Sequence, residues 1–129
     1  MILHAGDVGG SDILDELRLI APTKAVYGNT DEPGDPSLVQ RIEIEVGGVR
    51  IHVSHGHEVG SPTPDKLAGH YDADVVVYGH THQQLVTRVD NRLFVNPGSA
   101  GPRRFSLLPS VARLMIANGK AEVQIIDLA

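Results

Sequence analysis

The sequence predicts a mixed α/β domain, and two features of its hydrophobic pattern support this prediction. First, an apolar stretch, a helix-like stretch and a second apolar stretch follow one another between residues 2 and 28, and the same order returns between residues 49 and 80. A strand–helix–strand unit implies parallel pairing of its two strands. Second, the two-residue turn sequences Gly47-Gly48, Asp90-Asn91 and Asn118-Gly119 separate apolar stretches, as in β-hairpins. The later hairpins could build a second sheet beside a partly parallel one.

The first unit begins with ILHA at residues 2–5, which we expect to form a short strand. Ser11 can cap a helix that extends to about Ile20, with Asp12 in the first turn, where negative charge is favourable. KAVYGN at residues 24–29 is the next expected strand, followed by a loop rich in Pro, Gly and Asp. Apolar residues recur at helical spacing in the expected helix: Leu14, Leu17 and Ile20.

The rest of the chain is expected to be rich in strands. Ile42, Ile44 and Val46 alternate with charged residues, which is typical of a half-buried strand, and the turn after them leads into VRIHVSHG. SPTPDKLAGHY offers a short helix before the apolar strand DVVVYGH. Further strands are expected around residues 84–89 and 93–95, followed by a loop at residues 96–106 and the last hairpin.

Composition limits the classes of function. The net charge of -5, with 41% apolar and 21% charged residues, is that of an ordinary globular protein, with too little positive charge for strong nucleic-acid binding and no polybasic patch for a membrane surface. No apolar run approaches the roughly 20 residues that cross a bilayer, so we expect a cytoplasmic protein without membrane contact. Because the chain has no cysteine, imidazole, carboxylate and amide oxygen are the ligands available to a metal ion.

Polar residues follow four of the expected strands: Asp7, Asn29, His55 and the pair His80 and His82. The carboxyl ends of parallel strands lie along one edge of a sheet, where open α/β sheets bind their ligands, so these residues should converge. Four of the seven histidines fall in two His-x-His pairs, His55/His57 and His80/His82. This set suits a divalent ion such as manganese, iron, nickel or zinc.

Each of these residues has a structural alternative when it is considered alone. A Gly-Asp pair after a strand is common, Gly28-Asn29 can be a plain turn, and histidines occur in loops and at strand ends. Their occurrence together, each just past an expected strand, favours a metal site over these structural alternatives. We assign structural roles to the other three histidines: His4 lies inside a strand, His52 alternates outward from its neighbours, and His70 lies at a helix end, where a cation is favourable.

The motifs GD, GNTD, HGH and GHTH, followed by NPGS, resemble in this order the calcineurin-like metallophosphoesterase superfamily, in particular its small single-domain prokaryotic phosphodiesterases. The resemblance extends from Ile2 to about Ser99. It implies one metallophosphoesterase-like domain over residues 1–129, folded as an αββα four-layer sandwich of two mixed sheets. The implied activity is metal-dependent hydrolysis of a small phosphoester, with a phosphodiester as the expected substrate.

The resemblance also implies roles for individual residues at a centre of two metal ions. Asp7 would bridge both ions, Asn29, His55 and His80 would complete the ligands of one, and His82 would bind the other. Paired ions clamp the phosphoryl oxygens and activate a water molecule. Three further roles are carried over from GNTD and NPGS: Asp31 would orient a ligand or a water molecule, and Asn96 and Ser99 would contact the substrate phosphate.

Two departures from the family pattern lead to further expectations. Thr30 stands where the superfamily usually has a histidine that protonates the leaving group, so His57 becomes the candidate proton donor, with packing beside the ligands as the alternative. The family's Asp-x-His motif has no counterpart before Asp7, which predicts an N-terminally truncated domain that holds one ion firmly and hydrolyses esters weakly. The exposed neighbours of the missing strand predict a homo-oligomer.

Three interpretations of this departure stay open at the level of sequence. The chain could be a phosphodiesterase whose start lies upstream, a naturally shortened relative with weak or regulatory function, or a non-enzymatic scaffold that binds proteins, like the eukaryotic retromer subunit that resembles this branch. The presence of the complete set Asp7, Asn29, His55, His80 and His82 argues against the scaffold.

Overall fold

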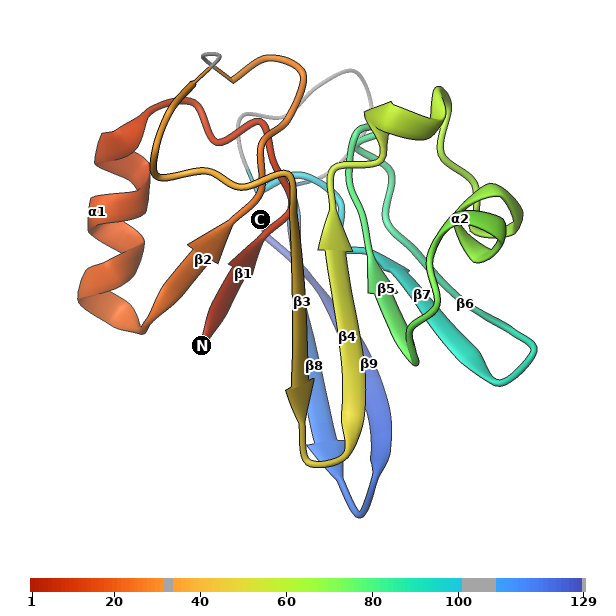
Figure 1. Cartoon of the computed structure of the whole chain (residues 1–129). Coiled ribbons are helices and arrows are strands. Elements are labelled where there is room, and N and C mark those ends of the chain that lie inside the picture. Colours follow the sequence, from red (N-terminus) through yellow and green to blue (C-terminus); the bar gives the residue numbers. More distant parts are fainter. Residues whose placement is uncertain (32–33, 101–108, 129) are drawn as a thin grey trace.

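The strand–helix–strand pattern and the hairpins produce a mixed α/β fold, seen in a computed structural model that describes residues 1–31, 34–100 and 109–128 (Figure 1). The predicted mixed α/β class is confirmed. No helix among these residues is long and apolar enough to cross a membrane.

The first unit consists of strand β1 (Ile2–His4), helix α1 (Ser11–Ile20) and strand β2 (Thr23–Ala25), and the two strands pair in parallel as predicted. Leu14 anchors the helix in a small cluster with Val8 and Ala25. Ile20, expected on the same face, is 78% exposed, because a two-stranded sheet covers only a narrow face of the helix.

The predicted cap at Ser11 is wrong. Gly10 occupies the N-cap position, and no side chain caps the helix. The chain enters α1 through Gly9 and Gly10 with φ of 92° and 136°. These are conformations that glycine adopts without steric cost, and they bring Ser11 into the first helical position.

The second unit lies in a five-stranded mixed sheet of order β3-β4-β5-β7-β6. The central pairs β4–β5 and β5–β7 are parallel, whereas the outer pairs β3–β4 and β6–β7 are antiparallel hairpins. A short 3-10 helix η1 (His57–Val59) and helix α2 (Pro64–His70) connect β4 to β5. The strands are β3 (Arg41–Val46), β4 (Val49–Ser54), β5 (Val75–Val77), β6 (Leu85–Val89) and β7 (Arg92–Asn96).

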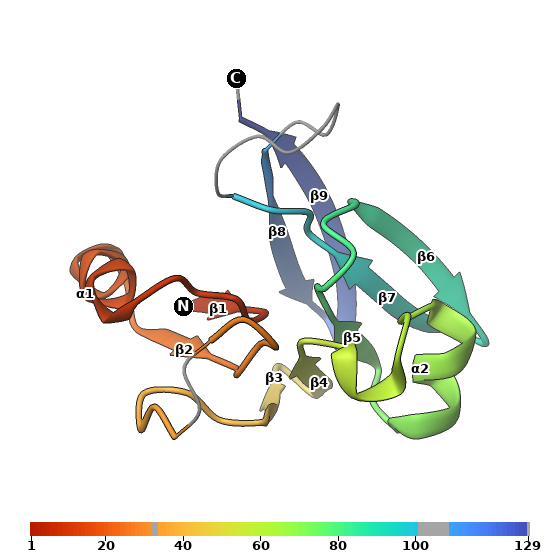
Figure 2. The ribbon, with the colours of Figure 1, turned by 90° about the horizontal axis from the view of Figure 1, so that it is seen from above.

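The two faces of this sheet are covered differently, because alternate residues of each strand point to opposite sides. Val75 contributes to a cluster shared with β1, with Val26 just after β2, and with the hairpin of β8 (Ser110–Ala117) and β9 (Lys120–Asp127). Val76 faces Leu67 of α2 instead. Figure 2 shows the hairpin on one side of the sheet and α2 on the other.

The resemblance implied a second mixed sheet, and the structure differs here. Within the described residues, that layer consists of two separate sheets, the parallel pair β1–β2 and the antiparallel pair β8–β9. No strand of the described chain pairs with both. Apolar packing joins the two pairs, since Leu3 and Ala5 contact the same cluster as Leu114 and Val123.

Candidate metal centre

The loops that follow β1, β2, β4 and β5 bring together four of the residues singled out in the sequence. Nε2 of His55 lies 3.0 Å from Oδ1 of Asn29 and 3.2 Å from Oδ2 of Asp7. Nδ1 of His80 lies 3.2 Å from the same Asn29 oxygen. The predicted convergence of Asp7, Asn29, His55 and His80 is therefore present, with Asn29 at its centre.

The position of the hydrogen on the His55 ring shows which of its two nitrogen atoms could bind a metal ion. Its Nδ1 lies 2.7 Å from the carbonyl oxygen of Ala5. A carbonyl only accepts hydrogen bonds, so Nδ1 carries the hydrogen. Burial lowers the pKa of His55, an effect that outweighs the opposing effects of the Ala5 carbonyl and of Asp7. The neutral ring therefore directs the lone pair of Nε2 at two oxygen atoms.

Three electron-pair donors that face one another at about 3 Å favour a cation between them. Among the residues that the structure describes, no three His, Cys, Asp or Glu side chains form a metal-binding group by themselves. The amide oxygen of Asn29 is thus needed to link Asp7 and His55 to His80. The donor set, one carboxylate, one amide oxygen and two imidazoles, fits a divalent metal ion.

Asp7 is held as a carboxylate. Burial acts to raise its pKa, but hydrogen bonds from the backbone and side chain of Thr30, together with weaker electrostatic effects of the nearby His55 and His82, outweigh burial, and the pKa is lowered. The Thr30 N–H donates to Oδ1 at 2.9 Å. Thr30, which replaces the family's usual histidine, thus contributes to the centre through its backbone.

His82 lies close enough to Asp7 to contribute to the lowering of the pKa of that carboxyl. It stands apart from the contacts around Asn29, and within the described part of the chain its buried Nδ1 has no hydrogen-bond partner. This is compatible with its predicted role at a separate ion, which stays a prediction.

The backbone is strained at three of the predicted ligands. Asp7, His80 and His82 have φ of 53°, 68° and 63°, in the left-handed region that residues other than glycine rarely adopt. Within the described residues, the other non-glycine positions of this kind, Asp90, Asn91 and Asn118, lie in hairpin turns. Strained conformations outside simple turns are typical of functional sites.

Asp31 was expected to orient a ligand or a water molecule. Its buried carboxylate accepts hydrogen bonds from the N–H groups of Val8 at 2.7 Å, Gly9 at 3.4 Å and Gly28 at 2.8 Å. It therefore joins the loop after β1 to the loop after β2. Any orienting effect on Asp7 and Asn29 acts through the backbone.

Asn96 plays a comparable role in the GHTH loop. Its side chain is fully buried, donates to the carbonyl of Gly79 and to Oγ1 of Thr81, and accepts from the Gly98 N–H. Its predicted contact with a substrate phosphate stays a prediction that this burial does not support. Ser99 is partly exposed, and its carbonyl accepts from the Ser110 N–H. Its predicted role also stays untested, and residues 101–106 of the same loop lie outside the described residues.

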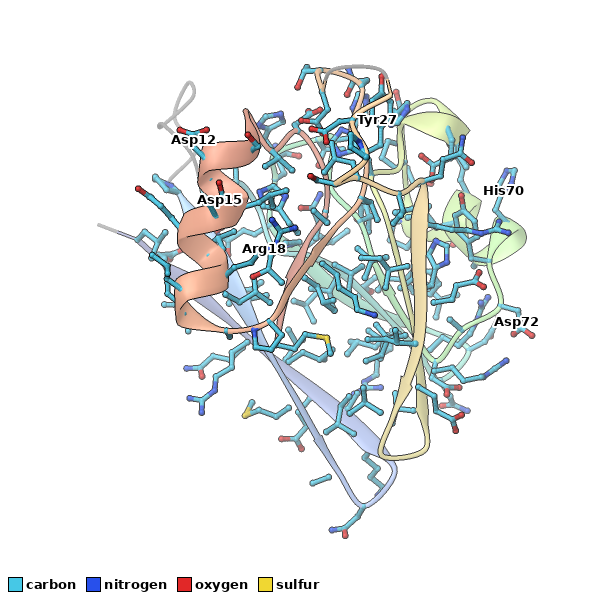
Figure 3. The ribbon with its side chains drawn as sticks, turned by 60° about the vertical axis from the view of Figure 1, so that its left-hand side comes forward. Asp12, Asp15, Arg18, Tyr27, His70 and Asp72 are labelled. Carbon is cyan, nitrogen blue, oxygen red and sulfur yellow. The ribbon has the colours of Figure 1, made fainter. Side chains whose placement is uncertain are left out.

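His57, the candidate proton donor, lies beside the cluster. Its ring centroid is 5.2 Å from that of His55, 6.3 Å from that of His80 and 6.1 Å from that of Tyr27. Figure 3 shows Tyr27 at the end of the molecule where the ligand-bearing loops gather. The sequence does not point to Tyr27 or to Glu58, which contacts the turn before His57, because neither residue type at these positions signals metal chemistry.

The three histidines assigned structural roles differ in their surroundings. His4 accepts a hydrogen bond from the Gly6 N–H and lies near enough to Asp7 and Asp31 to sense their charges. His52 is buried and stacks on Tyr71, whereas it was expected to face outward. It lies on the face of β4 that α2 covers. His70 is exposed at the end of α2, as expected.

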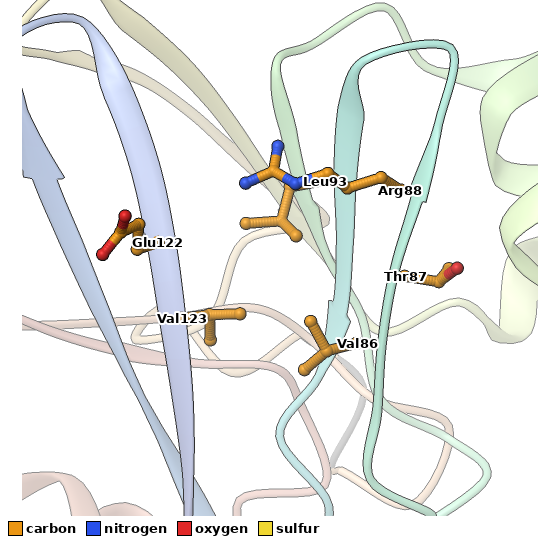
Figure 4. Close-up of a pocket in the computed structure, with 6 residues that line it drawn as sticks. All are labelled: Val86, Thr87, Arg88, Leu93, Glu122 and Val123. Atoms are coloured by element: carbon orange, nitrogen blue, oxygen red, sulfur yellow. The ribbon is translucent and has the colours of Figure 1, made fainter.

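A separate groove of about 420 Å³ lies between β6, β7 and β9 (Figure 4). None of its lining residues is a candidate ligand. They are Val86, Thr87, Arg88, Leu93, Glu122 and Val123.

Comparison with known proteins identifies the class. The domain model of the calcineurin-like phosphoesterase superfamily matches residues 1–119, and the chain belongs to this family. The resemblance seen in the motifs is thereby confirmed.

Individual relatives agree with this assignment. A probable metallophosphoesterase of Methanothermobacter thermautotrophicus is 34% identical to the chain, over 98% of the chain and 74% of the relative. A phosphodiesterase of Methanocaldococcus jannaschii is 29% identical, over 75% of the chain and 65% of that protein. Among solved structures, wild-type Vps29 of Entamoeba histolytica complexed with zinc has a TM-score of 0.79 and 28% identity, over 97% of the chain and 80% of Vps29.

Proposed function

We propose that this protein is a metal-dependent phosphoester hydrolase that acts on small phosphodiesters. The observation that carries the proposal is the meeting of Asp7, Asn29 and the neutral His55 as three electron-pair donors. Membership in the phosphoesterase family and the names of the relatives support the reaction class.

In this proposal, Asp7, Asn29, His55 and His80 hold a divalent ion from the series manganese, iron, nickel and zinc, and His82 with Asp7 serves a second ion. A bound ion of this kind polarises the phosphoryl group and lowers the pKa of a coordinated water molecule. The hydrogen bond from His55 Nδ1 to Ala5 keeps Nε2 free to act as a ligand. The zinc complex of Vps29 supports the fit of this fold to a divalent ion.

His57 is the proposed proton donor to the leaving group. Its ring is partly exposed and lies beside both His55 and His80, where an ester bound at the centre would be within reach. An imidazole titrates in the range useful for such a transfer. Ser99, partly exposed in the loop after β7, is the proposed contact for substrate oxygen atoms.

The test is hydrolysis of bis(p-nitrophenyl) phosphate in the presence and absence of Mn²⁺. We expect metal-dependent release of nitrophenol that His80→Ala abolishes, because this variant removes a ligand. His70→Ala, at the exposed end of α2, is the matched control and should keep the wild-type rate. Equal rates for wild type and His80→Ala, or equal rates with Mn²⁺ and with a chelator, would refute the proposal.

A protein-binding scaffold is the second candidate, and the fold similarity to Vps29 is the observation that bears on it. A scaffold has no chemical need for bare electron-pair donors at Asp7, Asn29 and His55. Metal-dependent hydrolysis lost in His80→Ala therefore separates the two candidates in favour of the enzyme.

We also propose that the protein forms a homo-oligomer. Strand β1 pairs only with β2 within the described residues, and Met1, Leu19 and Ile20 are 66%, 88% and 78% exposed. The Ile2 N–H donates to the Pro22 carbonyl, which places the first residues beside the end of α1. Exposed apolar side chains next to an unpaired strand edge favour self-association. The cytoplasmic location and the single domain over residues 1–129 stay predictions.

A further inference from the structure

The carboxylate of Glu58 accepts hydrogen bonds from two separate parts of the fold. Its Oε2 accepts from the N–H of Gly56 at 3.0 Å, and its Oε1 accepts from the hydroxyl of Tyr71 at 2.8 Å. These contacts link the turn between β4 and η1 to the end of α2. Glu58 belongs to none of the metal-binding motifs.

The first contact acts on the residue that separates His55 from His57. Gly56 is buried and has φ 103°, and it is the N-cap of η1. A side chain that reaches back to the N–H of the N-cap residue stabilises the start of a helix, as in a capping box. Without Glu58 this buried N–H would lose its acceptor, which favours a different turn.

The same carboxylate oxygen lies 3.8 Å from Nδ1 of His57. Among the described residues, this buried nitrogen has no hydrogen-bond partner. The position of the His57 ring therefore depends on the turn at Gly56 and on the nearby Glu58 charge. A shift of the turn would move His57 relative to His80 and Tyr27.

The second contact connects Glu58 to a rigid part of the fold. Tyr71 is the C-cap of α2, and its ring stacks on buried His52 with a centroid distance of 3.8 Å. Its carbonyl accepts from Nη1 of Arg92, on β7, at 2.7 Å. The hydroxyl that supports Glu58 is thus fixed by contacts to two strands of the five-stranded sheet.

We propose that Glu58 is a positioning residue for His57 and that Tyr71 supports it. Together they hold the turn from His55 to His57 so that the imidazole of His57 faces the metal centre. The expected effect of Glu58 on catalysis rests on the proposed function. Its expected effect on the position of the His57 ring rests on the hydrogen bonds and does not require that function.

The kinetic test compares Glu58→Ala with Glu58→Gln, using Mn²⁺ and bis(p-nitrophenyl) phosphate. Glutamine keeps an oxygen acceptor for the Gly56 N–H and an amide within reach of the Tyr71 hydroxyl, whereas alanine keeps neither. We expect Glu58→Ala to lower kcat by about 10- to 100-fold, the range seen when a residue that supports the side chains of a metal site is lost, with KM changed far less. Glu58→Gln should recover most of kcat, and Tyr71→Phe should lie between the two. An unchanged kcat in Glu58→Ala, or equal loss in both Glu58 variants, would overturn the proposal.

A second measurement does not depend on hydrolysis. In the full chain, nuclear Overhauser contacts between the ring protons of His57 and Tyr27 report whether His57 keeps its place. We expect these contacts in the wild type and in Glu58→Gln and expect their loss in Glu58→Ala. Their persistence in Glu58→Ala would contradict the positioning role even if kcat fell. A wild type that hydrolyses no ester would remove the proposed function, while the contacts would still decide the structural role of Glu58.

Discussion

Glycines of the candidate centre lie where a larger residue does not fit. A Cβ atom on Gly28 would meet the backbone nitrogen and the carboxylate of Asp7, and one on Gly6 would lie 2.6 Å from Nδ1 of His55. The loops after β1, β2 and β4 can therefore approach one another only because these positions carry no side chain. Close approach of the loops is what brings the ligand atoms within about 3 Å of one another.

Gly28→Ala is expected to displace Asp7 and to reduce metal-dependent hydrolysis by up to about 100-fold, since a shift of about 1 Å at a catalytic group can have that effect. Its Mn²⁺ affinity, measured by calorimetry, should fall as well. Gly69→Ala is the matched control, because a Cβ at Gly69 in α2 meets nothing within 4 Å. The control should keep the wild-type rate and gain about 0.5–1 kcal/mol of stability. Normal Mn²⁺ affinity in Gly28→Ala would contradict the expected displacement.

The burial of His52 affects how the stability of the protein depends on pH. Burial lowers its pKa below 6.5, against the raising effects of Glu43 and Glu58, with a small further lowering from Arg41. The unfolded chain therefore binds a proton at this residue at a higher pH than the folded chain does. The contribution of the neutral ring to the free energy of unfolding is complete above the pKa that His52 has in the unfolded chain. It decreases as the pH falls toward the pKa that His52 has in the folded chain.

His52→Phe tests this pH dependence, since it keeps a ring against Tyr71 and removes the titrating group. We expect the free energy of unfolding to fall less steeply in this variant than in the wild type as the pH falls below about 6.5. Urea denaturation at a series of pH values measures both slopes. Identical slopes would show that His52 does not contribute to the pH dependence, whatever the change in absolute stability.

At the scale of elements, α2 is the support of the His55–His57 turn. Leu67 is fully buried and packs in one cluster with Val76 and Phe94 of the five-stranded sheet and with Tyr78, which follows β5. Arg92 donates to the carbonyls of Ala68 and Tyr71 at the end of the helix. A short helix is thus held by one apolar anchor and by a capping side chain at each end, since the hydroxyl of Thr63 accepts from the Lys66 N–H at its start.

Leu67→Ala should lower the free energy of unfolding by about 2–5 kcal/mol, the range for truncating a buried leucine. Leu85→Ala provides the comparison, because Leu85 on β6 is 40% exposed, and its truncation should cost less than about 1 kcal/mol. Urea denaturation of the two variants measures the difference. Equal losses would mean that Leu67 does not anchor the helix.

At the scale of the whole molecule, the layer opposite the five-stranded sheet is divided into two two-stranded pairs within the described residues. Two-stranded sheets are marginally stable alone, and here both depend on packing against the shared cluster that includes Val53, Val75 and Val95. In the part of the chain that the structure describes, this division leaves strand edges without backbone partners, which connects the fold to the proposed self-association.

We expect light scattering after size-exclusion chromatography to give at least the mass of a dimer at micromolar concentrations. Leu19→Lys combined with Ile20→Lys should shift the protein toward the monomer, because it places charge on the exposed apolar end of α1. A wild type with the monomer mass at every concentration tested would refute the oligomer.

The sequence predicts the elements well where local signals are strong. The end of α1 at Ile20, the three hairpin turns and the parallel order of both strand–helix–strand units follow from spacing and turn residues. The convergence of Asp7, Asn29, His55 and His80 is predicted because all four follow apolar strands and match known motifs. The N-cap at Gly10 could not be predicted, since it depends on how the chain turns after β1.

The sequence by itself determined the family, the mixed α/β class and the residues that meet at the candidate centre, because motifs and periodicity are local in the chain. The tertiary structure decided what Asp31, Asn96 and Glu58 do. Asp31 contacts Val8 across 23 positions, Asn96 contacts Gly79 across 17, and Glu58 contacts Tyr71 across 13. Hydrogen bonds of this range arise only when separate loops fold together, so no local pattern encodes them.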